Sequence, residues 1–312
     1  MESRDKEYRQ NAMVIRYEIR QAKNDPEQGT CFEEIRITGM EGDALSVRIP
    51  ESIEGREVTA IGKKAFLSCG QIEEIHLPDT VHIMEDWAFA SCKHLRRISL
   101  KKGDLSFGKG IFKGCDAIRE IHLRSPEYDT EQPGLGFLFA AGFYLLDTPY
   151  LADAERAGTK EWYEIWDARM RAIMEMPDKA GFSKMLLCGV EDYGSRENTL
   201  EHYVSVNRAK KSRIAILRLR YPYQLSEKDR QMLTSFVLEH TKGCESEEAW
   251  EVLKEEYGDD ASYYKLFSEI GAINNRNCRA MISDLGEQHT ELKAYLLRES
   301  SRSGDFFDFL SL

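Results

Sequence analysis

The sequence predicts an α+β protein in which a short repeat solenoid with an N-terminal β-hairpin cap precedes an all-α helical domain. Three observations support this fold class: a 23-residue repeat between Val47 and Leu123, alternating apolar and polar residues before it, and helical periodicity after it. A chain of 312 residues is long enough for two hydrophobic cores. We therefore expect two domains, residues 1–125 and residues 126–312.

The segment before the repeats predicts the β-hairpin. Val14–Arg20 alternates apolar and polar residues as a half-buried strand does, and Glu33–Thr38 has the pattern of the returning strand. Asn24–Gly29 supplies turn residues between them, and Ala44–Ile49 predicts one more strand. Because the first turn of a solenoid would otherwise expose apolar residues and unpaired strand groups, we expect the hairpin to cover it.

Four positions keep one register through three consecutive repeats. A period of this length is typical of leucine-rich repeats, in which each repeat supplies a strand and stacks on its neighbours. We expect these side chains to form columns in a shared core. The columns are Phe66, Phe89 and Phe112; Cys69, Cys92 and Cys115; Ile75, Ile98 and Ile121; and Leu77, Leu100 and Leu123.

The residues between the inward Ile and Leu positions point outward and form the candidate interaction surface. Neighbouring strands lie about 4.8 Å apart, so one outward row should alternate in charge and stabilise the register. This face is either an ordinary solvated sheet or a binding face, and both interpretations stay open. The candidate residues are Glu74, His76, Arg97, Ser99, Glu120 and His122.

Trp87 is a further candidate for contact with a partner or with the helical domain. Its repeat equivalents are Lys64 and Gly110, and these residue types predict that the position is exposed. An exposed indole is a frequent contact residue because it combines a large apolar area with one polar group.

The repeat segment resembles the BspA-like leucine-rich repeat proteins. The residues that carry the resemblance are Ile37-Thr38-Gly39, Val47-Arg48-Ile49-Pro50, Ala65-Phe66, and the pattern Cys-x-x-Ile-x-x-Ile-x-Leu-Pro from Cys69 to Pro78. It covers about residues 32–125 and implies a bacterial, non-enzymatic scaffold that binds another protein. Because proteins of this family are often surface-attached, the resemblance also implies an alternative, an extracellular adhesin.

The second half of the chain has helical periodicity and predicts a bundle of short, stacked helices. Its last part, Ser262–Glu299, weakly resembles ankyrin-type helix-turn-helix repeats. An unrecognised ligand-binding or enzymatic site in this domain is a further alternative. The predicted helices are Phe137–Leu145, Lys160–Met174, Ala180–Cys188, Asn198–Leu219, Glu227–His240, Glu247–Tyr257, Ser262–Ile270, Asn275–Leu285 and Thr290–Glu299.

Charge is unevenly distributed. Residues 1–125 hold 20 Lys and Arg against 21 Asp and Glu, which leaves 23 against 33 for residues 126–312, a net charge of −10. This balance argues against nucleic acid and anionic membranes as partners. Met1–Tyr8 is charged and no apolar run is long enough to cross a bilayer, so with Met1 as the natural start we expect a cytoplasmic protein with reduced cysteines.

No residue pattern predicts catalysis, a cofactor or a metal. The glycines around Gly108 and Gly110 lack the Lys-Ser/Thr of a phosphate loop and fall in repeat register. His76 and His122 share a column but should lie about 10 Å apart, too far for one zinc ion. We therefore expect no enzyme and no metal site, and a protein partner whose identity and stoichiometry the sequence leaves open.

Two other segments have two interpretations each. The basic stretch between His202 and Ser226 is either a docking face or is neutralised by the nine acidic residues of Glu239–Asp260, and we favour neutralisation. The tail Asp305–Leu312, which holds three phenylalanines, either caps the last helices or is a binding motif for another protein's groove.

Overall fold

The computed structural model describes residues 6–10, 13–21, 32–125, 132–188, 199–287 and 289–302. Two predicted features, the turn at Asn24–Gly29 and the tail Asp305–Leu312, lie outside these residues. The chain divides into two compact units, Met1–Trp166 and Asp167–Leu312. The domain boundary after residue 125 stays a prediction. The first predicted helix packs on the last strand of the solenoid and belongs to the first unit.

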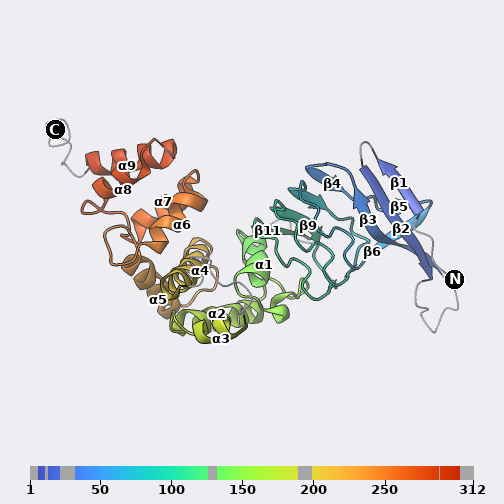
Figure 1. Cartoon of the computed structure of the whole chain (residues 1–312), viewed down its shortest axis with the longest axis horizontal. Coiled ribbons are helices and arrows are strands. Elements are labelled where there is room, and N and C mark those ends of the chain that lie inside the picture. The colour runs from blue at the N-terminus through green and yellow to red at the C-terminus, as the bar shows by residue number, and fades with distance from the viewer. Residues whose placement is uncertain are drawn as a thin grey trace. The chain divides into compact units, whose positions relative to one another are not determined.

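The first unit is a solenoid built on two sheets, which confirms the predicted fold class (Figure 1). One sheet has the order β11-β9-β7-β4 and is parallel; the other has the order β1-β2-β3-β6-β8-β10, with β5 paired to β6. The strands are β1 (Lys6–Gln10), β2 (Met13–Gln21), β3 (Glu33–Glu41), β4 (Ser46–Arg48), β5 (Ser52–Ile53), β6 (Arg56–Ile61), β7 (Glu74–His76), β8 (Ile83–Met84), β9 (Arg97–Lys101), β10 (Ser106–Phe107) and β11 (Glu120–Arg124).

The parallel sheet has four strands, one more than the three predicted repeats supply. Strands β7, β9 and β11 begin 23 residues apart, at Glu74, Arg97 and Glu120, but β4 begins 28 residues before β7, at Ser46. The short strand β5, which turns back on β6, lies within this longer first turn. The insertion breaks the period, so self-comparison of the sequence does not detect the first turn as a repeat.

The core of the solenoid consists of the predicted columns. Phe89 is completely buried between Phe66 and Phe112, and the ring centroids are 5.2 Å and 5.8 Å apart. The Ile and Leu columns are buried as well. In the sulfur column the thiols of Cys92 and Cys115 each donate a hydrogen bond of 3.0 Å, to the carbonyl oxygens of Phe66 and Phe89.

Each turn of the solenoid also contains left-handed backbone positions. Lys64, Trp87 and Gly110 occupy one such column, with φ of 61°, 58° and 59°. The column of Ser68, Ser91 and Gly114 has the same conformation. Glycine adopts this conformation without strain. The glycines at 110 and 114 are therefore parts of the repeat turn, as their register predicted, and not of a phosphate loop.

The N-terminal cap has three strands instead of the predicted two, because β1 pairs antiparallel with β2. The sequence of β1 is charged (KEYRQ) and carries no alternating apolar pattern, so it is not recognisable as a strand. Charged residues on an edge strand discourage pairing with other chains. Strand β3 is parallel to β6 and thus joins the cap to the solenoid sheet.

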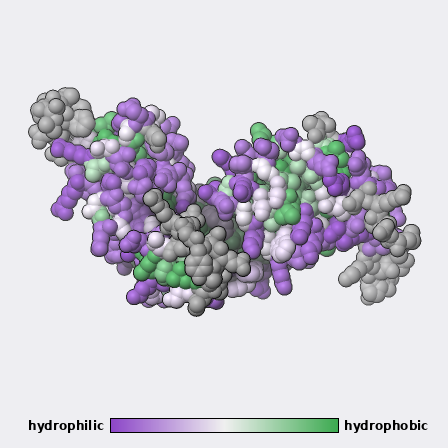
Figure 2. All heavy atoms as spheres, viewed as in Figure 1, coloured by the Kyte–Doolittle hydropathy of each residue, from purple (hydrophilic) through white to green (hydrophobic). Residues whose placement is uncertain are grey.

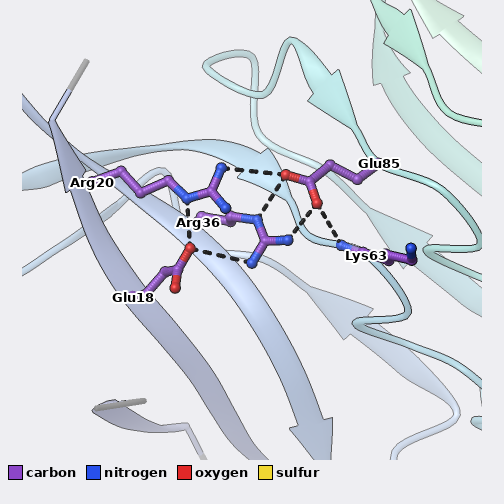
Figure 3. Close-up of polar contacts among 5 residues, drawn as sticks. All are labelled: Glu18, Arg20, Arg36, Lys63 and Glu85. Carbon is purple, nitrogen blue, oxygen red and sulfur yellow. Dashed lines mark hydrogen bonds and ion pairs between the residues drawn. The ribbon is translucent and has the colours of Figure 1, made fainter. Parts of the chain in front are cut away.

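A cluster of charged side chains fastens the cap to the second turn (Figure 3). Arg36 of β3 donates to both carboxylate oxygens of Glu85, with Nε 2.8 Å from Oε1, and its Nη1 lies 3.2 Å from Glu18. The backbone N–H of Lys63 also donates to Glu85, over 2.9 Å. Gly62 makes room for this contact, because a Cβ there would lie 2.7 Å from Cζ of Arg36.

Helix α1 (Leu135–Tyr144) covers the other end of the solenoid (Figure 1). It approaches β11 so closely that a Cβ on Gly136 would lie 2.9 Å from the carbonyl oxygen of Ile121. Phe143 packs its ring on Phe107 and edge-on against Phe112, with centroids 5.5 Å and 5.1 Å apart. The helix predicted at Phe137–Leu145 is thus the C-terminal cover of the first unit.

The second unit is helical, as predicted. Each predicted helix is present, with ends that differ by at most three residues. Besides α1, and a 3-10 turn at Pro149–Leu151, the helices are α2 (Lys160–Glu175), which contains the division between the units, α3 (Phe182–Cys188), α4 (Leu200–Arg220), α5 (Glu227–Glu239), α6 (Glu248–Tyr257), α7 (Ala261–Glu269), α8 (Cys278–Leu285) and α9 (Thr290–Arg302).

Helix α4 is the central element of the second unit and packs against α5, α6 and α7, while α8 packs on α9. Ser226 caps α5 by accepting from the N–H of Asp229. Helix α6 is preceded by Glu247, whose side chain accepts from the N–H of Gly243 and from Lys242. The similarity of the last helices to ankyrin repeats stays a prediction.

The Phe column predicts a large effect of truncating its middle ring. Phe89→Ala should lower the free energy of unfolding of the first unit by about 3–5 kcal/mol, because it empties a closed site between two other rings. Hydrogen exchange of the strand amides in 45–125 measures this loss. Lys93→Ala, an exposed position in the same repeat, should stay within about 0.5 kcal/mol of wild type. A change below about 1 kcal/mol for Phe89→Ala would contradict the core described above.

The cap cluster predicts a pH-dependent contribution to stability. Hydrogen bonding to Arg36 lowers the pKa of Glu85 from its ordinary value of 4.5. Since the folded pKa is depressed, the contribution is complete above about pH 4.5 and is lost as the pH falls through the lower folded pKa. Glu85→Gln should therefore destabilise the first unit by about 1–3 kcal/mol at pH 7, and by progressively less in acid.

Urea unfolding of wild type and Glu85→Gln between pH 7 and pH 2.5 tests this dependence. Glu51→Gln, an exposed carboxylate without a side-chain partner among the described residues, is the control and should follow wild type at every pH. A difference between wild type and Glu85→Gln that does not vary with pH would refute the role of the charge.

Candidate interaction surfaces

The outward side of the parallel sheet, which we call the strand face, holds six of the predicted residues. Strand pairing places Glu74 opposite Arg97 and Arg97 opposite Glu120; the next row has Ser99 between the two histidines. The sequence therefore predicted the rows correctly. The rows are Glu74–Arg97–Glu120 and His76–Ser99–His122.

The charges of the strand face pair with one another. Arg97 places Nε 2.7 Å from Oε2 of Glu120 and Nη1 3.7 Å from Oε1 of Glu74. His76 lies 3.4 Å from the same Glu74 carboxylate. Exposed pairs of this kind contribute at most about 1 kcal/mol each, but they leave little net charge to attract a partner.

The prediction that Ser99 belongs to an accessible surface is wrong, because only 5% of the residue is exposed. Arg124 lies over it and donates to its Oγ over 2.5 Å. The same guanidinium donates to the carbonyl oxygen of Leu77 and to Asp79. Alternation within the strand correctly predicted that Ser99 points outward. It did not predict that Arg124, two residues after the equivalent position His122, would cover it.

The histidines of the strand face do not form a metal site in the described part of the chain. His76 and His122 are separated by Ser99 in the row, as the register predicted. Among the residues that the structure describes, no group of three or more His, Cys, Asp or Glu side chains is placed to hold a metal ion.

Trp87 lies away from the strand face, in the left-handed turn column, and 43% of it is exposed, as its repeat equivalents predicted. Its ring covers Gly110, where a Cβ would lie 2.6 Å from the indole Cδ1, and the ammonium of Lys64 lies 5.0 Å from the ring centroid. We call the surface around it the turn face. Its exposed residues are Lys63, Lys64, Leu67, Trp87, Lys109 and Lys113.

The lysines of the turn face did not stand out in the sequence, although a signal was present. Lys63 and Lys109 are equivalent positions two repeats apart, and Lys64 and Lys113 occupy neighbouring columns. The repeat positions of the turn, compared in the same way as those of the strand, place these lysines on one side of the solenoid. Their separation along the chain concealed the patch.

The first unit has a surface hollow beside the turn face, and the second unit has another between two of its helices. The first has a volume of about 320 Å³ and lies beside the turn face, with Lys63, Ile83, Glu85, Asp86 and Gly108 among its lining residues. The second, of about 420 Å³, lies between α7 and α9 and is lined in part by Tyr264, Lys265, Tyr295 and Arg298. On the side of the molecule seen in Figure 2, most surface residues are hydrophilic and apolar residues form smaller patches.

The comparison with protein families agrees with the geometry of the stacked turns. Residues 45–131 match the BspA type leucine rich repeat region, in 6 copies. This part of the chain is a BspA-type leucine-rich repeat region. The predicted resemblance is confirmed, and repeats of this family are typically non-enzymatic and serve in protein interaction or at surfaces. No curated protein matches the chain.

Solved structures of bacterial leucine-rich repeat proteins are similar to a part of the chain. One, from T. pallidum, is 23% identical over 34% of this chain and 46% of its own, with a TM-score of 0.26. One from Bacteroides ovatus is 28% identical over 33% and 27%, with a TM-score of 0.25. A leucine rich cell surface protein of Faecalibacterium prausnitzii is 17% identical over 40% and 33%, with a TM-score of 0.30. The chain spans less than half the length of each.

Outside the BspA-type repeats, several basic residues of α4 are neutralised within the second unit. Lys211 and Arg208 both bind Asp178, over 2.7 Å and 2.8 Å. Arg213 lies 2.5 Å from Glu256. The favoured interpretation, neutralisation within the chain, is therefore confirmed for these three residues. From the predicted acidic segment, Glu256 forms an ion pair, and Glu245 and Glu248 act on Arg208 through their charge.

Arg218 of α4 is completely buried and forms a two-pronged ion pair with Asp167 of α2, over 2.7 Å and 2.9 Å. It also donates to the carbonyl oxygens of Tyr221 and Tyr223, just beyond the end of α4. The guanidinium thus binds α2 and the turn after α4 at once. This residue is structural, and the basic stretch offers less free charge than its sequence suggests.

The sulfur column is also structural. Cys69, Cys92, Cys115, Cys244 and Cys278 are free thiols. Hydrogen bonds with the neighbouring thiols of Cys115 and Cys69, together with burial, raise the pKa of Cys92. Hydrogen bonds with Cys92 lower the pKa values of Cys69 and Cys115. A thiol that stays protonated and buried is a poor nucleophile, so Cys92 is not suited to catalysis.

The buried pair predicts that removing one partner destabilises the second unit. Asp167→Ala should cost about 3–5 kcal/mol, because it leaves the Arg218 guanidinium buried without its counter-charge. Urea unfolding followed through the fluorescence of buried Trp250 measures the loss. Glu227→Ala, which removes the exposed partner of Arg230, should cost no more than about 1 kcal/mol. Equal effects of the two substitutions would contradict the assignment of Arg218 as a structural residue.

Proposed function

We propose that this chain is a non-enzymatic scaffold that binds another protein through the surface of its BspA-type solenoid. The main support is the way the stacked turns sort their side chains. The apolar columns point into the core, and each turn presents one regular strand face and one regular turn face to solvent. Repetition thereby builds broad surfaces whose residues come from several turns, which suits binding to an extended partner.

The titratable groups with shifted pKa values support a structural role for the charged residues. The pKa values of four carboxyl groups are lowered, and each carboxylate accepts hydrogen bonds from a Lys, Arg or Trp side chain of its own unit. These groups are Glu85, Asp178, Glu247 and Asp284. Burial raises the pKa of Tyr264, which lines the hollow between α7 and α9. A phenol shifted in this direction is a weaker acid and less suited to proton transfer at neutral pH.

We further propose that the scaffold works in a reducing compartment, the cytoplasm. The free thiols of Cys69, Cys92 and Cys115 support this, because aligned cysteines on adjacent turns could form disulfides in an oxidising environment. None of the helices in the described ranges is long and apolar enough to cross a bilayer.

Affinity capture from the native host, followed by binding of the purified candidate, tests the scaffold function. We expect at least one protein to bind the purified full chain directly in calorimetry. Phe89→Ala, which disturbs the stacked turns, should weaken this binding. If no captured protein binds directly, or if the chain instead turns over a small molecule, the scaffold proposal fails; binding only to extracellular ligands would favour the adhesin alternative.

A further inference from the structure

The turn face differs from the strand face in how its charges are balanced. On the strand face Arg97 lies between two glutamates. On the turn face, Lys63, Lys64, Lys109 and Lys113 are exposed, and in the part of the chain that the structure describes no ion pair involves any of them. The positive charge of this face is therefore available to a partner.

The nearby carboxylates offset only part of this charge. Asp86 shares a column with Lys63 and Lys109, but its Oδ1 accepts from the backbone N–H of Lys109 over 2.8 Å. Glu85 is held by Arg36 and by the backbone N–H of Lys63. Both acids are thus engaged in fixing the turn and the cap, while the lysine ammonium groups remain in solvent.

Trp87 lies among these lysines, with an exposed side chain and a left-handed backbone conformation. Its indole is 43% exposed, and its backbone has a left-handed φ of 58°. The equivalent position in the next repeat is Gly110, which fits this conformation without strain. The left-handed conformation belongs to the whole column, but a large apolar side chain exposed among lysines points to function more than to folding.

The hollow of about 320 Å³ continues the turn face. Lys63 and Asp86 belong to its lining, and Ile83 of β8 provides apolar surface within it. Leu67, 42% exposed, adds apolar area on the turn of the first repeat. The surface therefore combines lysines, an indole and a partly apolar recess.

We propose that the turn face binds an acidic protein segment that carries an aromatic side chain. The acidic groups would pair with the four lysines, and the aromatic ring would contact Trp87 or enter the neighbouring hollow. The inference rests on the proposed scaffold function and names its binding site and the chemistry of its partner. A short acidic segment is favoured over a nucleic acid, because the chain as a whole has a net charge of −11 and its repulsion of a ligand grows with the ligand's negative charge.

The test uses the full chain and a fluorescein-labelled twelve-residue peptide with the repeated sequence Glu-Phe-Asp-Glu, followed by anisotropy. Trp87→Gly should weaken binding at least tenfold. Because Gly110 occupies the equivalent position, this variant should keep the wild-type fold and melting temperature. The double variant Lys64→Glu/Lys109→Glu should also lose at least tenfold, with a smaller dependence of affinity on salt. Arg97→Gln, on the strand face, should stay within twofold.

Iodide quenching provides a direct measurement at the site. The protein has four tryptophans, of which Trp162, Trp166 and Trp250 are buried, so Trp87 is the indole that iodide can reach. The lysines should make iodide a stronger quencher than caesium, and bound peptide should protect the indole. Quenching that persists unchanged in Trp87→Gly would contradict this geometry.

Three outcomes overturn the inference. Wild-type protein that does not bind the peptide, or that binds it equally with and without Trp87, refutes the site. Loss of binding in Arg97→Gln alone assigns recognition to the strand face. Equal affinity for inorganic polyphosphate, or for a peptide with Gly in place of Phe, reduces the surface to a general polyanion site. None of these outcomes excludes a partner that binds another surface, so the scaffold function is tested separately by the capture and calorimetry described above.

Discussion

The structure of the first unit depends on the requirement that every turn of the stack be covered by another element. Each turn buries one side of its Phe, Ile and Leu side chains against the next, and the end turns have no further repeat to cover them. At the beginning of the stack, β3 continues the sheet and Arg36 binds Glu85 of the second turn. At the other end, α1 brings Phe143 against Phe107 and Phe112. Four turns are close to the minimum for a solenoid, so the two covers contribute a large part of its core.

This requirement also explains where the unusual residues lie. Gly62 and Gly136 occur where a neighbouring element approaches the backbone too closely for a side chain. Glu85 occupies the column of Gly62 and Gly108, and in that middle repeat its carboxylate provides the anchor for the cap. Small departures from the repeat therefore mark contacts between the solenoid and its covers. Trp87 departs from the repeat as well, yet within the described residues no covering element lies over it, so its indole is accessible to a partner.

In the second unit, charge has the anchoring role that aromatic rings have in the first. Arg218 binds Asp167 and two carbonyl groups of the turn after α4 without contact with solvent. Lys211 and Arg208 hold Asp178, in the turn between α2 and α3. A sequence rich in Lys and Arg thus loses most of its free charge on folding. On the solenoid, by contrast, the lysines of the turn face keep theirs, although fewer basic residues are concentrated in that part of the sequence.

The sequence by itself determined the repeat register, the core columns, the exposure of Trp87 and the helices, because these follow from local periodicity. It missed β1 and the first turn, where a charged strand and an insertion remove that periodicity. Only the tertiary structure decided which charges are free: Ser99 is covered by Arg124, and Arg218 is buried with Asp167, 51 residues away in sequence. It also gathered Lys63, Lys64, Lys109 and Lys113 around Trp87. Long side chains find partners across distances in sequence that periodicity does not encode, so the pattern predicted where side chains point but not what they meet.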